Sequence, residues 1–391
     1  MKLHFLGTGS SYPTTKRGVS SLALQQDDGS VWLFDSGEGT QIQAQKVTVS
    51  RQKINKIFIT HLHGDHMFGL PGLLCTISSQ FGLTEEQLKK EVPRVDIYGP
   101  KGLRRFIYTA LSLSRSPLIF QYCVHEMVPV SSQYTEDWGD WDVDHSEPSA
   151  THPSELPGVT IEPSVTEDGN VAETSFFLTF YVIFHFFSID NDEWCVQAGW
   201  IHHRVPSFGF VINERDRAGT LDKSKLMSLG VKPGPVYGQL KSGKSITLEN
   251  GDIITPEMVV GPPIRGRTLV ILGDTSDASP LAHMIKSCDV VVHEATHDDN
   301  LMDKAAEFGH STPSQAVAFA KGVNAKVLLL NHFSQRYSPS SKESLKEGEE
   351  TVALLEEQAQ AAAAGSGMSV QCADDFFVYE VPGTGRASMR V

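Results

Sequence analysis

Four potential metal ligands follow one short apolar run and lie within six residues of one another. Residues 54–60 (INKIFIT) are apolar and β-branched, which predicts a strand, and they are followed directly by His61, Leu62, His63, Gly64, Asp65 and His66. Imidazole and carboxylate groups suit Zn²⁺, with Mn²⁺ or iron as alternatives. Because these ligands share one turn and cannot easily converge on a single ion, we expect a two-metal site at the end of a strand.

Apolar runs in the second half of the chain also end in polar residues that could bind a metal or move a proton. The runs and the residues that follow them are 268–272 before Asp274, 290–292 before His293 and Glu294, and 327–330 before His332. Stretches with helical spacing separate or follow the predicted strands, at residues 70–80, 314–321 and 342–364. Continuous apolar strands that alternate with helices are typical of sheets covered on both faces, so the sequence predicts a layered α/β fold.

The composition is that of an ordinary globular protein, with 40% hydrophobic and 20% charged residues in a chain of 391. The five cysteines form no C-x-x-C pair, so neither a disulfide framework nor a zinc ribbon is indicated, and a reducing compartment fits best. The first residues do not resemble a signal peptide, from which we expect an intracellular protein, cytoplasmic or nuclear. The apolar run at 176–189 has fourteen residues, too few to cross a bilayer, so we expect a buried strand pair there and no membrane partner.

The net charge of −14 is unevenly distributed along the chain. Residues 116–203 hold fifteen Asp and Glu but no Lys or Arg, so the rest has 33 basic and 32 acidic residues, a net of +1. Within this window, residues 130–175 are rich in Pro, Ser and acidic residues, and we expect a disordered insertion there. Because the acidity belongs to one region, the charge does not exclude a nucleic-acid partner for the rest of the protein.

Several motifs, taken together and in order, resemble ribonuclease Z, a branch of the metallo-β-lactamase superfamily. Besides the histidine cluster they are residues 5–10 (FLGTGS), 34–41 (FDSGEGTQ), 203–209 (HRVPSFG), 273–275 (GDT), 293–296 (HEAT), 309–312 (GHST) and 331–337 (NHFSQRY). The resemblance implies a single domain, residues 1–391, with a four-layer αβ/βα sandwich and two Zn²⁺ ions per chain. It also implies a homodimer. The superfamily signature alone does not select a substrate.

The same resemblance assigns roles to the residues at the predicted strand ends. It implies that His61, His63 and His203 hold one metal, that Asp65, His66 and His332 hold the other, and that Asp274 bridges the two. His202 and His203 are adjacent, and strand alternation sends them to opposite faces, so only one of them can be a ligand. By the resemblance, Asp65 also takes the proton of the nucleophile, His293 donates a proton to the leaving oxygen, and Glu294 orients His293.

A lysine-rich segment is expected to bind the substrate. Residues 214–262 resemble the flexible arm with which ribonuclease Z holds tRNA, and residues 223–248 contain no acid and five lysines, Lys223, Lys225, Lys232, Lys241 and Lys244. Without the resemblance, a solvated charged surface would explain these lysines equally well. The other expected substrate contacts are Lys16, Arg17, Ser334, Arg336 and His310, although Ser311 or Thr312 beside His310 could serve only to cap a helix.

From these observations we expect a zinc-dependent endoribonuclease that removes the 3′ trailer of precursor tRNA and leaves a tRNA 3′ hydroxyl and a trailer 5′ phosphate. The alternative enzyme is a small-molecule phosphodiesterase, or another hydrolase, of the same fold. The alternative that is not an enzyme is a metal-bound RNA-binding protein. The histidines outside the motifs, His297 among them, are assigned no role.

Overall fold

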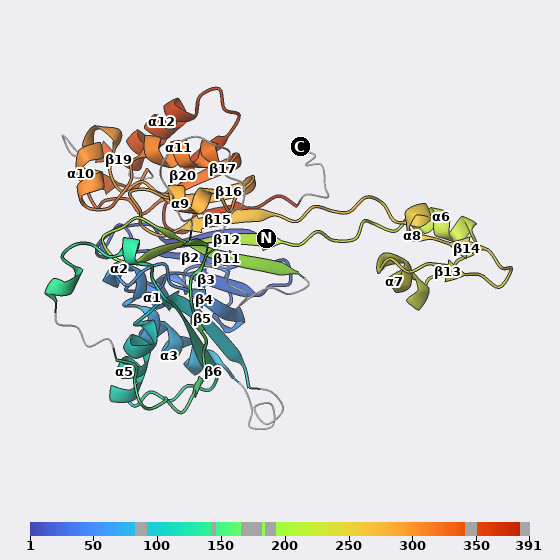
Figure 1. The fold of residues 1–391 in the computed structure, drawn as a ribbon, viewed down its shortest axis with the longest axis horizontal. Coiled ribbons are helices and arrows are strands. Elements are labelled where there is room, and N and C mark those ends of the chain that lie inside the picture. Colours follow the sequence, from blue (N-terminus) through green and yellow to red (C-terminus); the bar gives the residue numbers. More distant parts are fainter. Residues whose placement is uncertain (83–91, 142–145, 166–181, 184–192, 341–349, 384–391) are drawn as a thin grey trace.

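The computed structural model describes residues 1–82, 92–141, 146–165, 182–183, 193–340 and 350–383. Two large sheets lie face to face in the body of the molecule, and helices cover the outer face of each sheet (Figure 1). The α/β sandwich expected from the sequence is therefore confirmed, with two mixed sheets at its centre.

Within the described residues, the first sheet contains nine strands in the order β21-β1-β2-β3-β4-β5-β6-β7, with β8 also paired to β6. Their bounds are β1 (Lys2–Gly7), β2 (Ser21–Gln25), β3 (Val31–Phe34), β4 (Ile54–Phe58), β5 (Arg94–Pro100), β6 (Gln121–Met127), β7 (Glu155–Leu156), β8 (Thr160–Ile161) and β21 (Val378–Glu380). Strands β3 to β6 are parallel, so their carboxyl ends meet at one edge of the sheet.

The second sheet has six strands in the described part of the chain, in the order β11-β12-β15-β16-β17-β20. Their bounds are β11 (Trp194–Ile201), β12 (Ser207–Glu214), β15 (Thr268–Leu272), β16 (Cys288–Glu294), β17 (Ala325–Asn331) and β20 (Ser369–Cys372). Strands β11, β12 and β15 are antiparallel, and β15 to β20 are parallel. The carboxyl ends of β15, β16 and β17 therefore also share an edge.

Helices of both halves pack on the outer faces of the sheets (Figure 1). The first half supplies α1 (Thr40–Gln43), α2 (Gly64–Met67), α3 (Leu70–Gln80) and α5 (Leu103–Leu113), and the second supplies α9 (Ser279–Ala282), α10 (Met302–Glu307), α11 (Pro313–Gly322) and α12 (Val352–Ala363). Helix α3 buries Leu70, Leu73, Leu74 and Ile77, the spacing of one helix face. A short pair, β18 (Tyr337–Ser338) and β19 (Glu350–Thr351), lies outside the sheets.

Strand alternation separates the cores on the two faces of each sheet. In β4, Ile57 packs in the core under α3 and α5, whereas Phe58 packs in the core between the sheets. Between the sheets, the ring of Phe58 stacks on Phe34 at 4.8 Å and meets Phe210 of the second sheet edge-on at 5.1 Å. These buried rings fix how the two sheets face each other, and with that how their strand ends meet.

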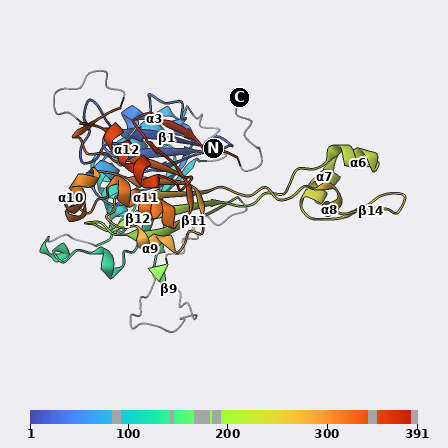
Figure 2. The same ribbon diagram turned by 90° about the horizontal axis from the view of Figure 1, so that it is seen from above.

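Residues between β12 and β15 form an arm that extends far from the body (Figures 1 and 2). Isolated bridges join the two antiparallel segments of its stalk, Arg217 to Ile264 and Leu221 to Val260. The tip contains α6 (Lys223–Ser228), α7 (Pro235–Lys241), β13 (Ile246–Thr247), β14 (Ile253–Ile254) and α8 (Pro256–Val259). The apolar side chains buried there are Leu226, Val231, Leu240, Ile246, Ile254 and Val259. The tip therefore has a small hydrophobic core of its own.

Part of the acidic region that the composition predicted to be disordered is folded. Strands β7 and β8 pair with β6, and the buried Glu155 carboxylate accepts a hydrogen bond from Arg104 Nε at 2.6 Å. Strand pairing and this ion pair therefore order this part of the region, although its composition is typical of disorder. Apart from Val182–Ile183 (β10), which pairs with Ser164–Val165 (β9), the apolar run at 176–189 lies outside the described residues. No helix in the described ranges is long and apolar enough to cross a membrane.

Candidate metal centre and active site

The strand ends of the two sheets bring the expected ligands together. His61, His63, Asp65 and His66 follow β4 in the first sheet, and Asp274 and His332 follow β15 and β17 in the second. His203 lies in the turn between β11 and β12. The backbone joins the two edges here, because Phe208 N donates to Thr60 O at 3.0 Å and Gly273 N donates to Phe208 O at 3.2 Å. The site is thus built from residues far apart in the sequence.

One group of ligand atoms consists of three imidazoles and a carboxylate. His61 Nε2 and His203 Nε2 each lie 3.2 Å from His63 Nδ1, and His61 Nε2 lies 3.7 Å from Asp274 Oδ2. All the ligand atoms of this group lie within 4.8 Å of one another. In a tetrahedral zinc site with metal–nitrogen bonds of about 2.0–2.1 Å, neighbouring ligand atoms are about 3.3 Å apart. The group therefore fits a zinc ion.

A second group shares the carboxylate of Asp274 with the first. His332 Nε2 lies 3.3 Å from His66 Nε2, 3.4 Å from Asp65 Oδ2 and 3.2 Å from Asp274 Oδ2. His66 Nε2 lies 3.3 Å from Asp274 Oδ1. The ligand atoms of this group also lie within 4.8 Å of one another. With one carboxylate common to both groups, the two groups adjoin each other, and the ligand atoms of each could hold a metal ion.

Burial sets the protonation of several ligands. It lowers the pKa of His61 well below the ordinary value and that of His203 to about 4, so both imidazoles are neutral near pH 7. A neutral imidazole is the form that binds a metal. Burial acts the other way on Asp274, but the neighbouring His332 and His66 outweigh it and hold the pKa of this carboxyl well below its usual range.

Hydrogen-bond partners behind the rings orient the ligand histidines His66 and His203. Asp35 Oδ2 accepts a hydrogen bond from His66 Nδ1 at 2.7 Å, and the Asp35 carboxylate also accepts from Thr60 N at 2.8 Å. His203 Nδ1 donates to the carbonyl oxygen of Gly309 at 2.6 Å. The backbone of Asp35 has φ of 59°, a left-handed conformation that is unusual outside glycine. Such partners fix the tautomer and direction of metal ligands.

His310 is the imidazole beside the ligand cluster that has a carboxylate behind it. Its Nδ1 lies 3.0 Å from Glu294 Oε1 and 3.8 Å from Asp274 Oδ2. Glu294 is held in turn by the backbone N–H of Thr275, which donates to Oε1 at 2.8 Å. Burial opposes protonation of His310, but the charge and hydrogen bond of Glu294 prevail and raise its pKa to about 9. The pair can therefore hold a proton next to the metal ligands.

The structure places His293 away from the metal ligands, contrary to the role expected for it. His293 and Glu294 are neighbours in β16, and alternation turns their side chains to opposite faces. Glu294 faces His310, whereas the ring of His293 lies 5.7 Å from that of Phe319 on α11, and its Nδ1 donates to the Glu294 carbonyl at 2.8 Å. The expectation that His293 meets the leaving oxygen was therefore wrong.

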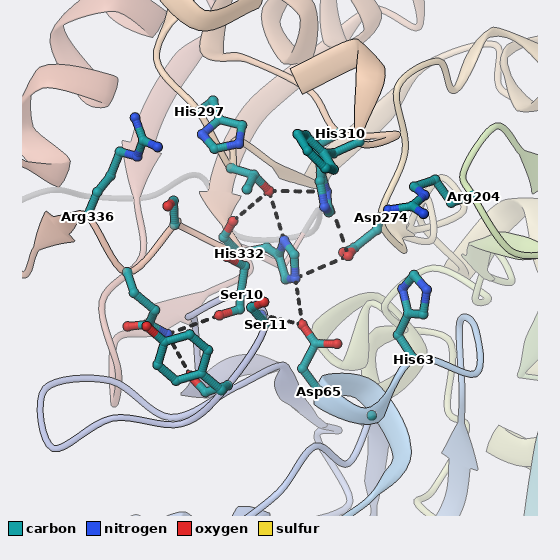
Figure 3. Close-up of a pocket in the computed structure, with 16 residues that line it drawn as sticks. Ser10, Ser11, His63, Asp65, Arg204, Asp274, His297, His310, His332 and Arg336 are labelled. Carbon is teal, nitrogen blue, oxygen red and sulfur yellow. Dashed lines mark hydrogen bonds and ion pairs between the residues drawn. The ribbon is translucent and has the colours of Figure 1, made fainter. Parts of the chain in front are cut away.

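A cavity of about 760 Å³ opens over the metal ligands. Its walls include Asp65, His63, Asp274 and His332, and also the expected substrate residues His310, Ser334 and Arg336. Figure 3 shows Arg204, Asp274 and His63 on one side of this pocket and Arg336 and His297 on the other, with Asp65 and His332 between them. A phosphodiester strand could therefore lie across the metal site with an arginine on each side.

Arg17, expected to contact the substrate, is instead buried beneath the pocket wall. It is 2% exposed, and its Nη1 donates to Thr8 Oγ1 at 2.6 Å and to Asp374 Oδ1 at 2.8 Å. Its guanidinium lies 5.3 Å from the ring centre of Phe333. Arg17 therefore supports the loop rather than facing solvent. Lys16 next to it is exposed, and its Nζ donates to Ser338 Oγ at 3.0 Å.

The expected substrate residues of the arm lie at its tip. Their side chains are all exposed: Lys223, Lys225, Lys232, Lys241 and Lys244. The tip core holds the helices that carry Lys223, Lys225 and Lys241, while the lysine side chains remain in solvent. The structure thus places these lysines at the tip of the arm, away from the candidate metal ligands in the body (Figure 1).

Comparison with known proteins gives matches over nearly the full length. Zinc phosphodiesterase ELAC protein 1 is 45% identical in Bos taurus, over 98% of this chain and 99% of that protein, and 44% identical in Homo sapiens over the same shares. Ribonuclease Z of Bacillus mycoides (strain KBAB4) is 37% identical over 90% of this chain and 94% of that protein. The chain belongs to the ribonuclease Z family.

Solved structures agree with this membership of the ribonuclease Z family. The crystal structure of human tRNase Z, short form (ELAC1), matches with a TM-score of 0.60 and 32% identity, over 98% of this chain and 100% of that one. A long-form RNase Z from yeast matches with a TM-score of 0.51 and 16% identity, over 97% of this chain and 42% of that one, which supports the fold alone. A family model described as Anti-Pycsar protein Apyc1 matches residues 1–92.

Some residues of this ribonuclease Z site were not singled out from the sequence. Asp35 and Thr296 orient ligand histidines, and Tyr12, Arg204 and His297 line the pocket. Asp35 and Thr296 lie within motifs that resemble the family, and both follow predicted strands. This position is the signal from which their role could have been predicted. Arg204 follows His203 directly. Tyr12 and His297 carry no pattern of their own, because their place in the pocket depends on the packing of distant segments.

Proposed function

We propose that this protein is a zinc-dependent endoribonuclease that removes the 3′ trailer of precursor tRNA, with two zinc ions per chain. The observation that carries the proposal is the pair of four-ligand groups that share Asp274, in a chain of the ribonuclease Z family. The products would be a tRNA with a 3′ hydroxyl and a trailer with a 5′ phosphate. When bound, two zinc ions would supply a hydroxide near neutral pH and neutralise charge on the phosphate.

The side chain of Asp65 is suited to the nucleophile side of the reaction. Its Oδ2 accepts a hydrogen bond from Ser11 N at 2.6 Å, and it lies 3.4 Å from His332 Nε2. Burial would raise the pKa of Asp65, but the charges of His66 and His332 outweigh it and lower the pKa, so the group stays a carboxylate. Asp65 would therefore both hold a metal and accept the proton of the attacking water.

His310 is suited to the leaving-group side. Cleavage that leaves the phosphate on the trailer expels the O3′ oxygen of the last tRNA nucleotide, which needs a proton. Since Nδ1 of His310 faces Glu294, its Nε2 is free to donate toward the pocket. Glu294 orients the ring and stabilises its charged form, as a carboxylate behind a catalytic histidine does in other hydrolases. We therefore assign the proton transfer once expected of His293 to His310.

The arm would bind the body of the tRNA. Its exposed lysines lie far from the metal ligands, so they can neutralise phosphates without taking part in the chemistry (Figure 1). This separation favours a large polyanionic substrate, because a small phosphodiester in the pocket would not reach the tip. Family likeness also leads us to propose a homodimer, which sedimentation at several concentrations would test. An intracellular location stays a prediction.

The direct test is incubation of the zinc-loaded protein with a precursor tRNA that carries a 3′ trailer and a 5′ label. We expect one cut after the last tRNA nucleotide, a product whose 3′ hydroxyl accepts nucleotides from a poly(A) polymerase, and a trailer whose 5′ phosphate permits ligation. Turnover of bis(p-nitrophenyl) phosphate without any cut in the precursor tRNA would favour the small-molecule phosphodiesterase instead.

A charge variant of the arm tests its role. Replacement of Lys223, Lys225, Lys232, Lys241 and Lys244 by Gln should raise KM for precursor tRNA and reduce the salt dependence of binding by a log–log slope of about 0.7 to 0.9 per lost contact. The matched control replaces the same lysines by Arg, which keeps the charge and should keep the slope. Turnover of bis(p-nitrophenyl) phosphate should be the same in all three proteins. Equal losses on both substrates would contradict a binding role for the arm.

A further inference from the structure

His297 is a histidine in the pocket that neither the metal groups nor the proton transfer uses. It follows Thr296 in the loop after β16 and is 7% exposed. Its ring lines the cavity over the metal ligands, and Figure 3 shows it between Arg336 and His310. The side chain therefore belongs to the pocket wall on the same side as the proposed proton donor.

No internal hydrogen bond explains this ring. Its Nδ1 is buried and has no hydrogen-bond partner among the described residues, and polar atoms buried without a partner are uncommon in folded proteins. By contrast, His293, which lies in β16 just before this loop, bonds to the carbonyl of Glu294, and His310 bonds to the Glu294 carboxylate. A purely structural histidine would be expected to have such a bond. Because Nδ1 is closed to solvent, the nitrogen that can meet a ligand in the pocket is Nε2, for which no hydrogen bond is found among the described residues.

The surroundings of His297 favour a neutral ligand group over a phosphate. Burial and the neighbouring charges of Arg336 and His310 lower its pKa to about 4, so the ring is uncharged near pH 7. A neutral imidazole has one donor and one acceptor nitrogen. A hydroxyl group offers the same pair of functions, whereas a phosphate offers only acceptors and is already faced by Arg336 on this wall.

The proposed reaction places a hydroxyl at this wall. O3′ of the last tRNA nucleotide must reach His310 to receive its proton, and the 2′ hydroxyl is attached to the neighbouring carbon of the same ribose. We propose that His297 hydrogen-bonds this 2′ hydroxyl and so makes the enzyme select a ribose at the cleaved bond. The proposal rests on the proposed function, since it needs O3′ as the leaving atom. The 2′ hydroxyl is the group by which proteins distinguish RNA from DNA.

The experiment compares two precursor tRNAs that differ by one oxygen. One is all RNA, and the other has a 2′-deoxyribose at the last tRNA nucleotide. The missing hydroxyl makes O3′ a poorer leaving group whatever the protein does, so the informative quantity is the ratio of kcat/KM for the two substrates. In His297→Phe this ratio should fall by about three- to tenfold relative to the unmodified protein, the usual value of one neutral hydrogen bond. His297→Gln, which keeps a donor and an acceptor, should retain part of the ratio.

Matched controls separate this contact from a general effect on the pocket. Phe308→Leu changes another pocket residue that has no polar atom in its side chain, and it should leave the ratio as it is. A substrate with deoxyribose at the first trailer nucleotide should lose the same factor in the unmodified protein and in His297→Phe. Zinc content and melting temperature show whether each variant is folded, and His297→Ala gives a second reading of the ratio.

An unchanged ratio in folded, zinc-loaded His297→Phe and His297→Ala would overturn the proposal while leaving the proposed function intact. A ratio that falls equally in Phe308→Leu would also overturn it, because the effect would then belong to the pocket as a whole. If the unmodified protein cuts neither precursor, the proposed function itself fails, and the inference fails with it.

Discussion

Replacement of His310 by Ala tests the assignment of the proton donor. His310 lies 3.0 Å from Glu294 and 3.8 Å from Asp274. It belongs to neither of the two groups to which we assign zinc, although its ring forms a third cluster of ligand atoms with Asp274, Glu294 and His332. The variant should therefore keep its zinc and lose the ability to protonate the leaving oxygen. His293→Ala is the matched control, because it removes the histidine that precedes Glu294 in β16 and faces Phe319.

The expected loss follows from the usual contribution of a general acid. Its removal costs about 10² to 10⁴ in rate, equivalent to about 2.7 to 5.4 kcal/mol in the activation free energy. His293→Ala should instead lower the free energy of unfolding by about 1 to 3 kcal/mol, because it leaves a gap beside α11, with little change in kcat. The His310→Ala and His293→Ala variants should thus give opposite patterns of rate and stability.

The assay is single-turnover cleavage of a precursor tRNA with either oxygen or sulfur at the 3′ bridging position. A thiolate is a better leaving group than an alkoxide and needs no proton, so the sulfur substrate should be cut by His310→Ala at nearly the rate of the unmodified protein. A defect of similar size on both substrates would refute the role as proton donor, and loss of zinc from His310→Ala would make His310 a metal ligand instead.

Other parts of the site make separate predictions. Asp35→Asn should weaken zinc binding by about 10- to 100-fold, because Asp35 orients His66, and competition with a chelator measures this; unchanged affinity would remove Asp35 from the site. Glu294→Gln should cleave the oxygen substrate more slowly than the unmodified protein but cleave the sulfur substrate at nearly the same rate, since Glu294 acts through His310. Arg17→Met should lower the free energy of unfolding in urea by about 1 to 3 kcal/mol, as it leaves buried partners unpaired, and a smaller change would contradict the observed hydrogen bonds. Leu240→Ala should loosen the arm tip and expose it to proteases while sparing turnover of bis(p-nitrophenyl) phosphate, so a loss of that turnover would show that the tip supports the body.

The strands and helices with a regular pattern could be predicted from the sequence. The predicted strand at 268–272 and the predicted helix at 70–80 have the bounds found in the structure. In each, the apolar residues follow a regular local spacing, and their side chains face a core on one or both sides of the element. The helix predicted at 342–364 is shorter, since α12 begins at Val352 and residues 341–349 lie outside the described part.

The errors concern residues whose neighbours come from far along the chain. Strand alternation separates His293 from Glu294, but only the packing of β16 between the metal ligands and α11 decides which of the two faces the site. From the sequence alone Arg17 is expected to be an exposed cation. Its partner Asp374 is 357 residues away, so the pairing that buries Arg17 has no local signal. His297 has no motif, and its position follows from the loop after β16 and the residues that surround the pocket.

The arrangement divides substrate selection between two places. Lysines at the arm tip would bind phosphates equally in the ground state and the transition state, so they would improve kcat/KM without improving kcat at saturation. His297 would act beside the leaving oxygen, where the ribose shifts as the bond breaks, so its contact can strengthen in the transition state. We therefore expect the charge variant of the arm to change KM chiefly, and His297→Phe to change the rate of the chemical step on ribose substrates. If both variants changed KM alone, the 2′ hydroxyl contact would serve binding and not catalysis.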